Sequence, residues 1–161
     1  MNMIYVNVRA FIIRERDGVE EVYVQRRMKA HEGVYPIELP GGQLKKYESL
    51  IDCLKREVKE ETGFDVMEVV DPLQFVETKS TQGFVVECMS PFAVYQTVEG
   101  PVDSMGVYFK CYVSGNALDI GDDSERVGWV TKEALARIVE EDVVSGIDKA
   151  GMQFYLNGRK D

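Results

Sequence analysis

The chain has 161 residues and a formal net charge of −9 at pH 7. This length is typical of one domain with a substantial core and is too short for two full-sized domains, so we expect a single domain over residues 1–161. The acidic balance disfavours sequence-independent binding to a nucleic acid polymer, because such binding needs Lys and Arg to neutralise phosphates. An anionic ligand would therefore need a metal ion or a local basic patch.

Three features of the sequence favour a cytoplasmic location. No segment approaches the roughly 20 apolar residues that cross a bilayer, so we expect no membrane partner. The first residues lack the basic stretch that precedes the apolar run of a secretory signal peptide. Cys53, Cys88 and Cys111 form no CxxC pair, and their odd number and wide spacing disfavour both a disulfide framework and a zinc site.

The first half of the chain predicts strands followed by one helix. Residues 3–14 and 20–27 are β-rich runs on either side of the turn signal RDG, which predicts two adjacent strands. A loop and the short apolar piece YPIELPGG come next. A helix is predicted over residues 47–62, with Gly63 placed to end it.

The second half predicts more strands and a further helix. Several runs are apolar and β-branched enough for strands: FDVMEVVDPLQFVET, GFVVECMSPFAVYQTV, MGVYFKCYVSG and VGWV. Thr131 is placed to cap a helix in TKEALARIVEED, and the end of the chain fits another short helical stretch. Strands on both sides of a central helix imply an α/β or α+β sandwich with a mixed sheet.

The central helix carries Glu57, Glu60 and Glu61 beside its apolar stripe. At about 100° per residue, that stripe comprises Tyr47, Leu50, Ile51, Leu54 and Val58. A run of charges is ordinarily a solvated helix face. However, carboxylates at the margin of a buried face must be protonated, paired or metal-bound, because an unpaired buried charge is costly. Positions i, i+3 and i+4 converge, so the alternative is a cation site of hard oxygen ligands for Mg²⁺, Mn²⁺ or Ca²⁺.

A pair of glycines, Gly41 and Gly42, precedes this helix. Glycine permits close approach of the backbone to a ligand. A tight loop can direct its N–H groups and the helix N-terminus at an anion. A plain turn explains the pair equally well.

The spacing of these residues carries a family resemblance. Gly42, then five residues, Glu48, then seven residues and the run 56–64 match every fixed position of the Nudix box, GX5EX7REUXEEXGU, where U is aliphatic or aromatic. The chain therefore resembles the Nudix (MutT-like) hydrolases. The resemblance implies a Nudix-type α/β/α sandwich with a mixed central sheet, and a pyrophosphohydrolase that splits a nucleoside diphosphate linked to another moiety.

The resemblance also implies roles for residues of the box. Glu57, Glu60 and Glu61 would hold Mg²⁺ or Mn²⁺ and act in catalysis. Arg56 would orient Glu57 through a charge-assisted hydrogen bond. Gly41 and Gly42 would shape the loop at the substrate. For Glu48, a functional role and a favourable acid in the first helical turn are equally consistent with the sequence.

Residues outside the box complete the predicted site. The family often takes a further carboxylate from a later loop, and we favour Glu125 over Asp122, Asp123 and Glu99, although a solvated acidic turn explains any of them equally well. Arg27 is a candidate for binding phosphate, and Tyr35 is a candidate for stacking on a base. His31 is a weaker candidate base, since a surface histidine is the simpler interpretation.

Several functional alternatives follow from the same resemblance. The main alternative is a non-catalytic, nucleotide-sensing regulator with the Nudix fold; a third is an isomerase of isoprenyl diphosphates. The nucleotide-derived substrate stays open among ADP-ribose-like sugars, nucleoside triphosphates and dinucleoside polyphosphates. Many relatives dimerise, and the apolar stretch SPFAVYQTV could supply a homodimer interface.

Overall fold

The computed structural model describes residues 3–28, 36–70, 74–121 and 124–158. The helices are α1 (Leu50–Thr62), α2 (Lys132–Glu140) and α3 (Lys149–Asn157). The strands are β1 (Tyr5–Arg16), β2 (Val19–Arg27), β3 (Ile37–Glu38), β4 (Gly41–Gln43), β5 (Asp65–Val69), β6 (Phe75–Lys79), β7 (Val85–Met89), β8 (Ala93–Gln96), β9 (Ser104–Ser114), β10 (Ile120–Gly121) and β11 (Ser124–Thr131). No helix in these ranges has the length and apolar composition needed to cross a membrane.

The main sheet is mixed, as the sequence predicts. Its strands follow the order β10-β11-β2-β1-β9-β5, while β3 pairs with β2, β4 with β1 and β8 with β9. Strand β1 lies antiparallel to β2 and parallel to β9. The turn between β1 and β2 contains Asp17 (φ 52°) and Gly18 (φ 78°), and positive φ at both central residues suits a tight hairpin.

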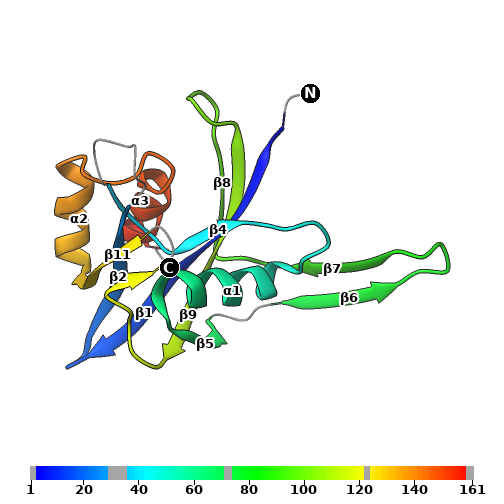
Figure 1. Cartoon of the computed structure of the whole chain (residues 1–161), viewed down its shortest axis with the longest axis horizontal. Helices are drawn as coiled ribbons and strands as arrows, with labels where there is room; N and C mark the ends of the chain where they lie inside the picture. Colours follow the sequence, from blue (N-terminus) through cyan, green and yellow to red (C-terminus); the bar gives the residue numbers. More distant parts are fainter. Residues whose placement is uncertain (1–2, 29–35, 71–73, 122–123, 159–161) are drawn as a thin grey trace.

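Helices cover both faces of this sheet (Figure 1). Alternate residues of β1 enter two different cores, because successive strand side chains point to opposite faces. Phe11 and Ile13 pack with residues of α2 and α3. Val8, Ala10 and Ile12 pack with α1. The fold is therefore the α/β/α sandwich that the resemblance implied.

Helix α1 begins and ends at capping residues. The Ser49 side chain accepts a hydrogen bond from the Asp52 N–H, and Gly63 adopts a left-handed φ of 81° at the C-terminus. The predicted start at Tyr47 is wrong, because Tyr47 has a φ of 59° and is 97% exposed, outside the helix and its apolar stripe. Leu54 and Val58 of that stripe are fully buried.

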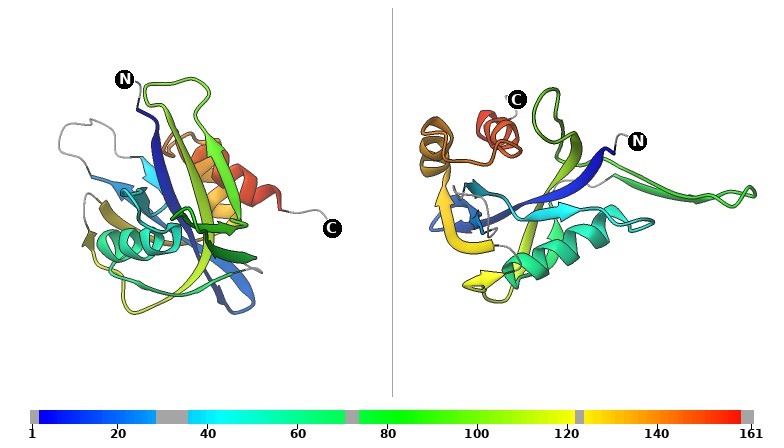
Figure 2. Two further views of the ribbon diagram at one scale, coloured as in Figure 1. Left: turned by 90° about the vertical axis from the view of Figure 1, so that its right-hand side faces the viewer. Right: turned by 45° about the horizontal axis from the view of Figure 1, so that its top comes forward.

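Strands β6 and β7 form a separate two-stranded sheet that projects from the body of the molecule (Figures 1 and 2). Its apolar side chains are largely exposed, among them Val76, Phe84 and Val85. Met89, at the base of this hairpin, packs against the α1 core. The hairpin therefore adds little to the main core.

We predict that Phe11→Ala lowers the free energy of unfolding by about 3–5 kcal/mol, since it empties a fully buried site. The Phe11 ring contacts Phe92, Tyr108 and Tyr155, with centroid distances of 5.0–5.4 Å. Urea denaturation measures the change. Phe84→Ala is the matched control: its ring is 64% exposed, so its effect should stay within about 0.5 kcal/mol. Equal losses in the two variants would contradict this description of the core.

Candidate active site

A cavity of about 440 Å³ opens where β1 and β4 meet the α1 helix. It brings together six of the residues that the sequence predicts for the site: Arg27, Gly41, Gly42, Glu57, Glu60 and Glu61. Helical spacing explains the glutamates, and the pairing of β4 with β1 brings the two glycines to the same wall. The cavity is thus lined by acidic groups, arginines and a glycine loop.

Arg56 neutralises the acidic groups of the box. Its Nε and Nη2 donate to the two Glu48 carboxylate oxygens at 2.7 and 2.9 Å, while Nη1 donates to Glu57 at 2.5 Å and to Glu60 at 3.3 Å. The hydrogen bonds from Arg56 lower the pKa of Glu48 to about 2. Arg56 is therefore held by Glu48 and contacts Glu57, the residue that the resemblance assigns it to orient.

Glu61 lies deeper than the other two glutamates. One of its carboxylate oxygens accepts hydrogen bonds from the Gln25 amide at 2.7 Å and from the Gly41 N–H at 3.0 Å. Burial raises the pKa of Glu61 to about 8 despite these bonds. Gln25 also donates to Glu38 at 3.1 Å, while its Oε1 is buried with no hydrogen-bond partner among the described residues. The Gln25 Oε1 therefore offers an acceptor near Glu61 to a hydrogen-bond donor or a cation.

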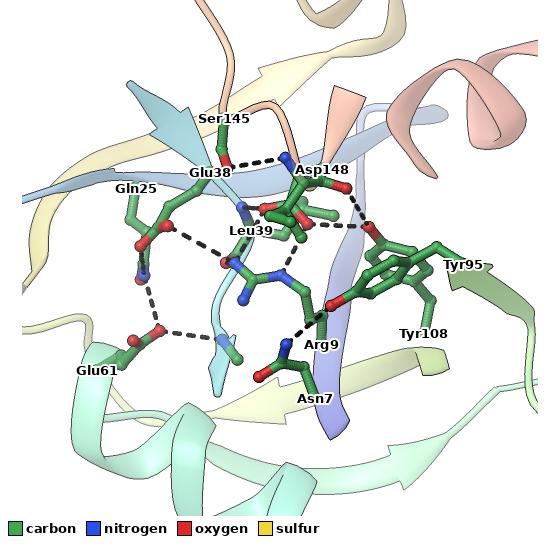
Figure 3. Close-up of polar contacts among 12 residues, drawn as sticks. Asn7, Arg9, Gln25, Glu38, Leu39, Glu61, Tyr95, Tyr108, Ser145 and Asp148 are labelled. Atoms are coloured by element: carbon green, nitrogen blue, oxygen red, sulfur yellow. Dashed lines mark hydrogen bonds and ion pairs between the residues drawn. The ribbon is translucent and has the colours of Figure 1, made fainter. Parts of the chain in front are cut away.

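A buried ionic network forms the floor of the cavity (Figure 3). Arg9 donates to both carboxylate oxygens of Asp148 at 2.7 and 2.9 Å and to the Leu39 carbonyl at 2.5 Å. The Leu39 N–H and the Tyr108 hydroxyl also donate to Asp148, at 2.8 and 2.9 Å. Glu38 lies 3.7 Å from Arg9, and burial raises its pKa.

The sequence patterns did not predict this network. One signal was present: Arg9 interrupts the apolar run of β1, and Glu38 directly precedes Leu39 in the glycine-loop segment. A charged residue inside an apolar strand needs a buried partner. The partner, Asp148, lies 139 residues further along the chain, and no local pattern marks it.

Close approaches around the helix explain three glycines. A Cβ on Gly42 would lie 2.4 Å from the Glu57 carboxylate, and one on Gly41 would lie 2.4 Å from the Val8 carbonyl oxygen. At the end of the helix, a Cβ on Gly121 would lie 1.8 Å from the Glu61 carbonyl oxygen. Gly42 therefore leaves room for the Glu57 side chain, whereas Gly41 and Gly121 permit close approach to the backbone of β1 and of the end of α1.

Comparison with known proteins identifies the family. The profile of the NUDIX domain matches residues 3–149, most of the chain. The chain belongs to the NUDIX domain family. This membership supports the predicted class of enzyme, a Nudix pyrophosphohydrolase.

Curated relatives of this Nudix protein match over a short segment. The chain is 50% identical over 44 residues to "mRNA-decapping enzyme subunit 2" of Saccharomyces cerevisiae strain YJM789 and to "m7GpppN-mRNA hydrolase" of strain S288c. The matched segment is 27% of this chain and 4% of each relative. The chain therefore spans a small part of the length of these relatives.

Solved structures support the fold over nearly the whole chain. A MutT protein from Methanosarcina mazei Go1 has a TM-score of 0.60 at 19% identity, covering 98% of this chain and 96% of that one. The NUDIX domain of Shewanella oneidensis NrtR complexed with ADP ribose has a TM-score of 0.61 at 16% identity, covering 98% and 89%. At these identities the likeness establishes the Nudix fold.

The Nudix box residues fit a hard divalent cation in their chemistry. In the described residues, no three His, Cys, Asp or Glu side chains gather closely enough to form a ready metal site. Glu57, Glu60 and Glu61 nevertheless line one cavity, and carboxylate oxygens are the ligands that Mg²⁺ and Mn²⁺ prefer. Burial raises the pKa of Glu57 and Glu61, so a cation would favour their charged forms.

The remaining predicted residues either do not line the cavity or fall outside the described residues. Tyr35 and His31 fall outside the described residues, as do Asp122 and Asp123. Glu125 pairs with Arg26, whereas the adjacent Ser124 pairs with Arg27, the residue that lines the cavity. Because neighbours on a strand face opposite sides, Glu125 lies on the other face from Arg27. Its catalytic role stays a prediction.

We predict that alanine affects a different property at each of the two loop glycines. In Gly41→Ala the new Cβ meets backbone atoms of β1, so the free energy of unfolding should fall by about 1–3 kcal/mol. In Gly42→Ala it meets the Glu57 side chain, which can move, so Mn²⁺ affinity should fall more than stability. Thermal melts and titration calorimetry with Mn²⁺ measure both quantities. A Gly42→Ala protein with normal Mn²⁺ affinity would contradict the assignment of Glu57.

We predict that the metal-free protein loses stability as pH rises from 4.5 to about 8. The folded pKa of Glu61, raised to about 8 by burial, lies above its ordinary value of 4.5, so the folded state retains a proton that the unfolded chain has lost. Stability that is present below pH 4.5 is therefore lost through this window. Melting temperatures measured in EDTA across it should fall less steeply in Glu61→Gln. If the melting temperature changed with pH equally in Glu61→Gln and in the unmodified protein, the pKa of Glu61 would not be raised.

Proposed function

We propose that this Nudix protein is a divalent-metal-dependent hydrolase that cleaves the pyrophosphate linkage of a nucleoside diphosphate derivative, with water attacking phosphorus. One observation carries the proposal: a single cavity joins the three box glutamates to two arginines and the glycine loop. Carboxylates hold a cation, and arginines bind phosphate oxygens. A cavity lined by both kinds of group suits a metal-bound pyrophosphate.

Glu57, Glu60 and Glu61 would hold Mg²⁺ or Mn²⁺. When bound, the cation supplies neutralising charge to the phosphates and lowers the pKa of a coordinated water. Glu60 has a side chain that is 43% exposed, and it is held to Arg56 only at 3.3 Å, so it is free to turn toward a cation. Arg56 keeps Glu57 in place by a shorter contact of 2.5 Å.

Arg9 and Arg27 would bind the phosphate oxygens that the cation leaves unneutralised. Within the described residues the Arg9 Nη1 group makes no hydrogen bond, whereas Nε and Nη2 are fixed by Asp148 and Leu39. A guanidinium fixed by its other nitrogens presents its remaining donors without further loss of side-chain freedom. Arg9 is thus ready to donate into the cavity.

The substrate class is proposed at the level of nucleoside diphosphate derivatives. ADP-ribose-like and other nucleoside diphosphate sugars are supported by the NrtR domain, which was solved with ADP ribose. Nucleoside triphosphates are supported by the likeness to MutT proteins. A nucleic acid polymer is disfavoured by the net charge of −9, although the yeast relatives are named for mRNA substrates.

A nucleotide-sensing regulator is the second candidate, and one feature favours it. Arg56 holds Glu57 and Glu60, while Gly41 and Gln25 hold Glu61, so all three glutamates already have partners. A protein that keeps these pairs would bind a nucleotide without turnover.

A cytoplasmic location and a homodimer are further parts of the proposal. All three cysteines are unpaired, which suits a reducing compartment. In the described sheet β8 pairs only with β9, so its outer edge is open, and Val94 on it is exposed. Analytical ultracentrifugation over a concentration series tests the homodimer; a monomer at every concentration would overturn it.

The hydrolase is tested by release of phosphate or nucleotide from a substrate panel. The panel contains nucleoside diphosphate sugars, dNTPs, oxidised dGTP, dinucleoside polyphosphates, NADH and a capped oligonucleotide, each with Mg²⁺, Mn²⁺ or EDTA. Metal-dependent turnover of one class would support the hydrolase and name its substrate. Nucleotide binding by calorimetry without turnover of any substrate would instead support the sensor.

We predict that Glu60→Gln and Glu61→Gln each lower kcat about 10²–10³-fold on the active substrate, because each removes a charge that holds the cation at the reacting phosphate. Steady-state kinetics at several Mg²⁺ concentrations measures the loss. Glu68→Gln is the matched control, since Glu68 is an exposed glutamate of β5 outside the cavity. Unchanged hydrolysis in both site variants would sink the hydrolase proposal.

A further inference from the structure

One wall of the cavity is made by alternate residues of a single strand. Tyr5, Asn7 and Arg9 of β1 all line it, as period-two alternation requires. Arg9 lies at the end beside Glu38 and Glu61, where the phosphates would bind. Tyr5 and Asn7 lie further along the strand, so they face the part of a substrate that lies beyond its phosphates.

The amide of Asn7 has a fixed direction. Its Nδ2 donates to the Tyr95 hydroxyl at 2.9 Å (Figure 3). Its Oδ1 makes no hydrogen bond with any described residue, and Asn7 lines the cavity. Because a single amide group carries both atoms, holding the nitrogen on Tyr95 directs the oxygen away from it. The wall therefore presents a hydrogen-bond acceptor.

Gly106 makes this arrangement possible. It pairs with Asn7 across the parallel β1–β9 ladder and with Tyr95 across the β8–β9 ladder. A Cβ at Gly106 would lie 2.4 Å from a Tyr95 ring carbon and 2.7 Å from the Asn7 carbonyl oxygen. Glycine inside a strand weakens it and marks a place of close approach. Here it is the ring of Tyr95, whose hydroxyl holds Asn7, that approaches the Gly106 backbone.

The surroundings of Asn7 suit a flat ring. Tyr5 is 38% exposed, so a ring face or edge is accessible to a ligand. Val102 and Ile147 add apolar surface to the same cavity, and Ser104 lies across the ladder from Tyr5. Ligand sites commonly combine apolar walls with a few oriented polar groups. Aromatic side chains stack on nucleobases, and a base edge supplies the matching hydrogen bonds.

We propose that Tyr5 and Asn7 form a nucleobase subsite, in which the Asn7 Oδ1 accepts a hydrogen bond from an exocyclic amino group. Adenine and cytosine carry an amino group where hypoxanthine and uracil carry a carbonyl oxygen. The subsite therefore prefers adenine to hypoxanthine and cytosine to uracil. Its place in a substrate rests on the proposed function, since the phosphates are assigned to the Arg9 end of the wall.

The test compares the binding of AMP and IMP. In IMP a carbonyl oxygen replaces the 6-amino group of the base, and N1 carries a hydrogen. Isothermal titration calorimetry uses the full chain without metal, so the result does not depend on hydrolysis. We expect AMP to bind about three- to tenfold more tightly than IMP, the range for one neutral hydrogen bond. Equal affinity, a preference for IMP, or no binding of either nucleotide would overturn the proposal.

Variants separate the acceptor from the fold. Asn7→Leu removes the acceptor and Tyr95→Phe releases the amide, so both should bring the AMP to IMP ratio close to one. Asn7→Asp keeps an acceptor and should keep the preference for AMP, although its negative charge should lower the affinity for both nucleotides. Asn116→Leu, at an exposed asparagine outside the cavity, is the matched control and should leave the ratio unchanged. A ratio that survives in Asn7→Leu would overturn the role of Asn7.

The two proposals fail in different ways. A substrate panel without turnover, together with a preserved AMP preference, would remove the hydrolase and leave the base subsite in place. Metal-dependent turnover with no AMP preference would remove the subsite and leave the hydrolase in place.

Discussion

The site depends on the buried ion pair between Arg9 and Asp148. Both side chains are almost wholly buried, and each would carry an uncompensated charge without the other. The pair also receives the Leu39 N–H, so it ties the segment before the glycine loop to β1 and to the start of α3. Gly41 then lies where its N–H reaches Glu61. This ionic contact thus helps to set the distance between the glycine loop and α1.

A second constraint is the crowding of negative charge on α1. Arg56 is the cation shared by Glu48, Glu57 and Glu60, whereas the deeper Glu61 accepts hydrogen bonds from two neutral donors, the Gln25 amide and the Gly41 N–H. Burial accordingly raises the pKa of Glu61, whereas direct contact with Arg56 lowers that of Glu48. The helix therefore holds one glutamate whose raised pKa favours its neutral form in the absence of a cation, at the other end of the box from Glu48, whose pKa is lowered. A bound cation would supply Glu61 with the positive charge that Arg56 supplies to the other glutamates.

Local sequence signals predicted the elements well and their tertiary partners poorly. The β1–β2 hairpin, the Gly63 end of α1, the Thr131 cap of α2 and the mixed sheet are confirmed, because turns, caps and alternation act between near neighbours. The error at Tyr47 has the same origin: helical periodicity continues through it, but the Ser49 cap and its own positive φ begin the helix later. The prediction of Glu125 rests on a carboxylate that family members often supply from a later loop, without fixed spacing. The register between β11 and β2 places Glu125 on the opposite face from Arg27.

The sequence by itself determined the family and the acidic face of α1, because the box glutamates share one helix and their convergence follows from 3.6 residues per turn. Only the tertiary structure decided which groups face them. Arg9 meets Asp148 across 139 positions, and Asn7 meets Tyr95 across 88. Such contacts depend on strand order and register, which bring together segments that carry no shared local pattern. The acidic face of α1 therefore follows from local sequence, whereas the β1 wall of the cavity is a product of the fold.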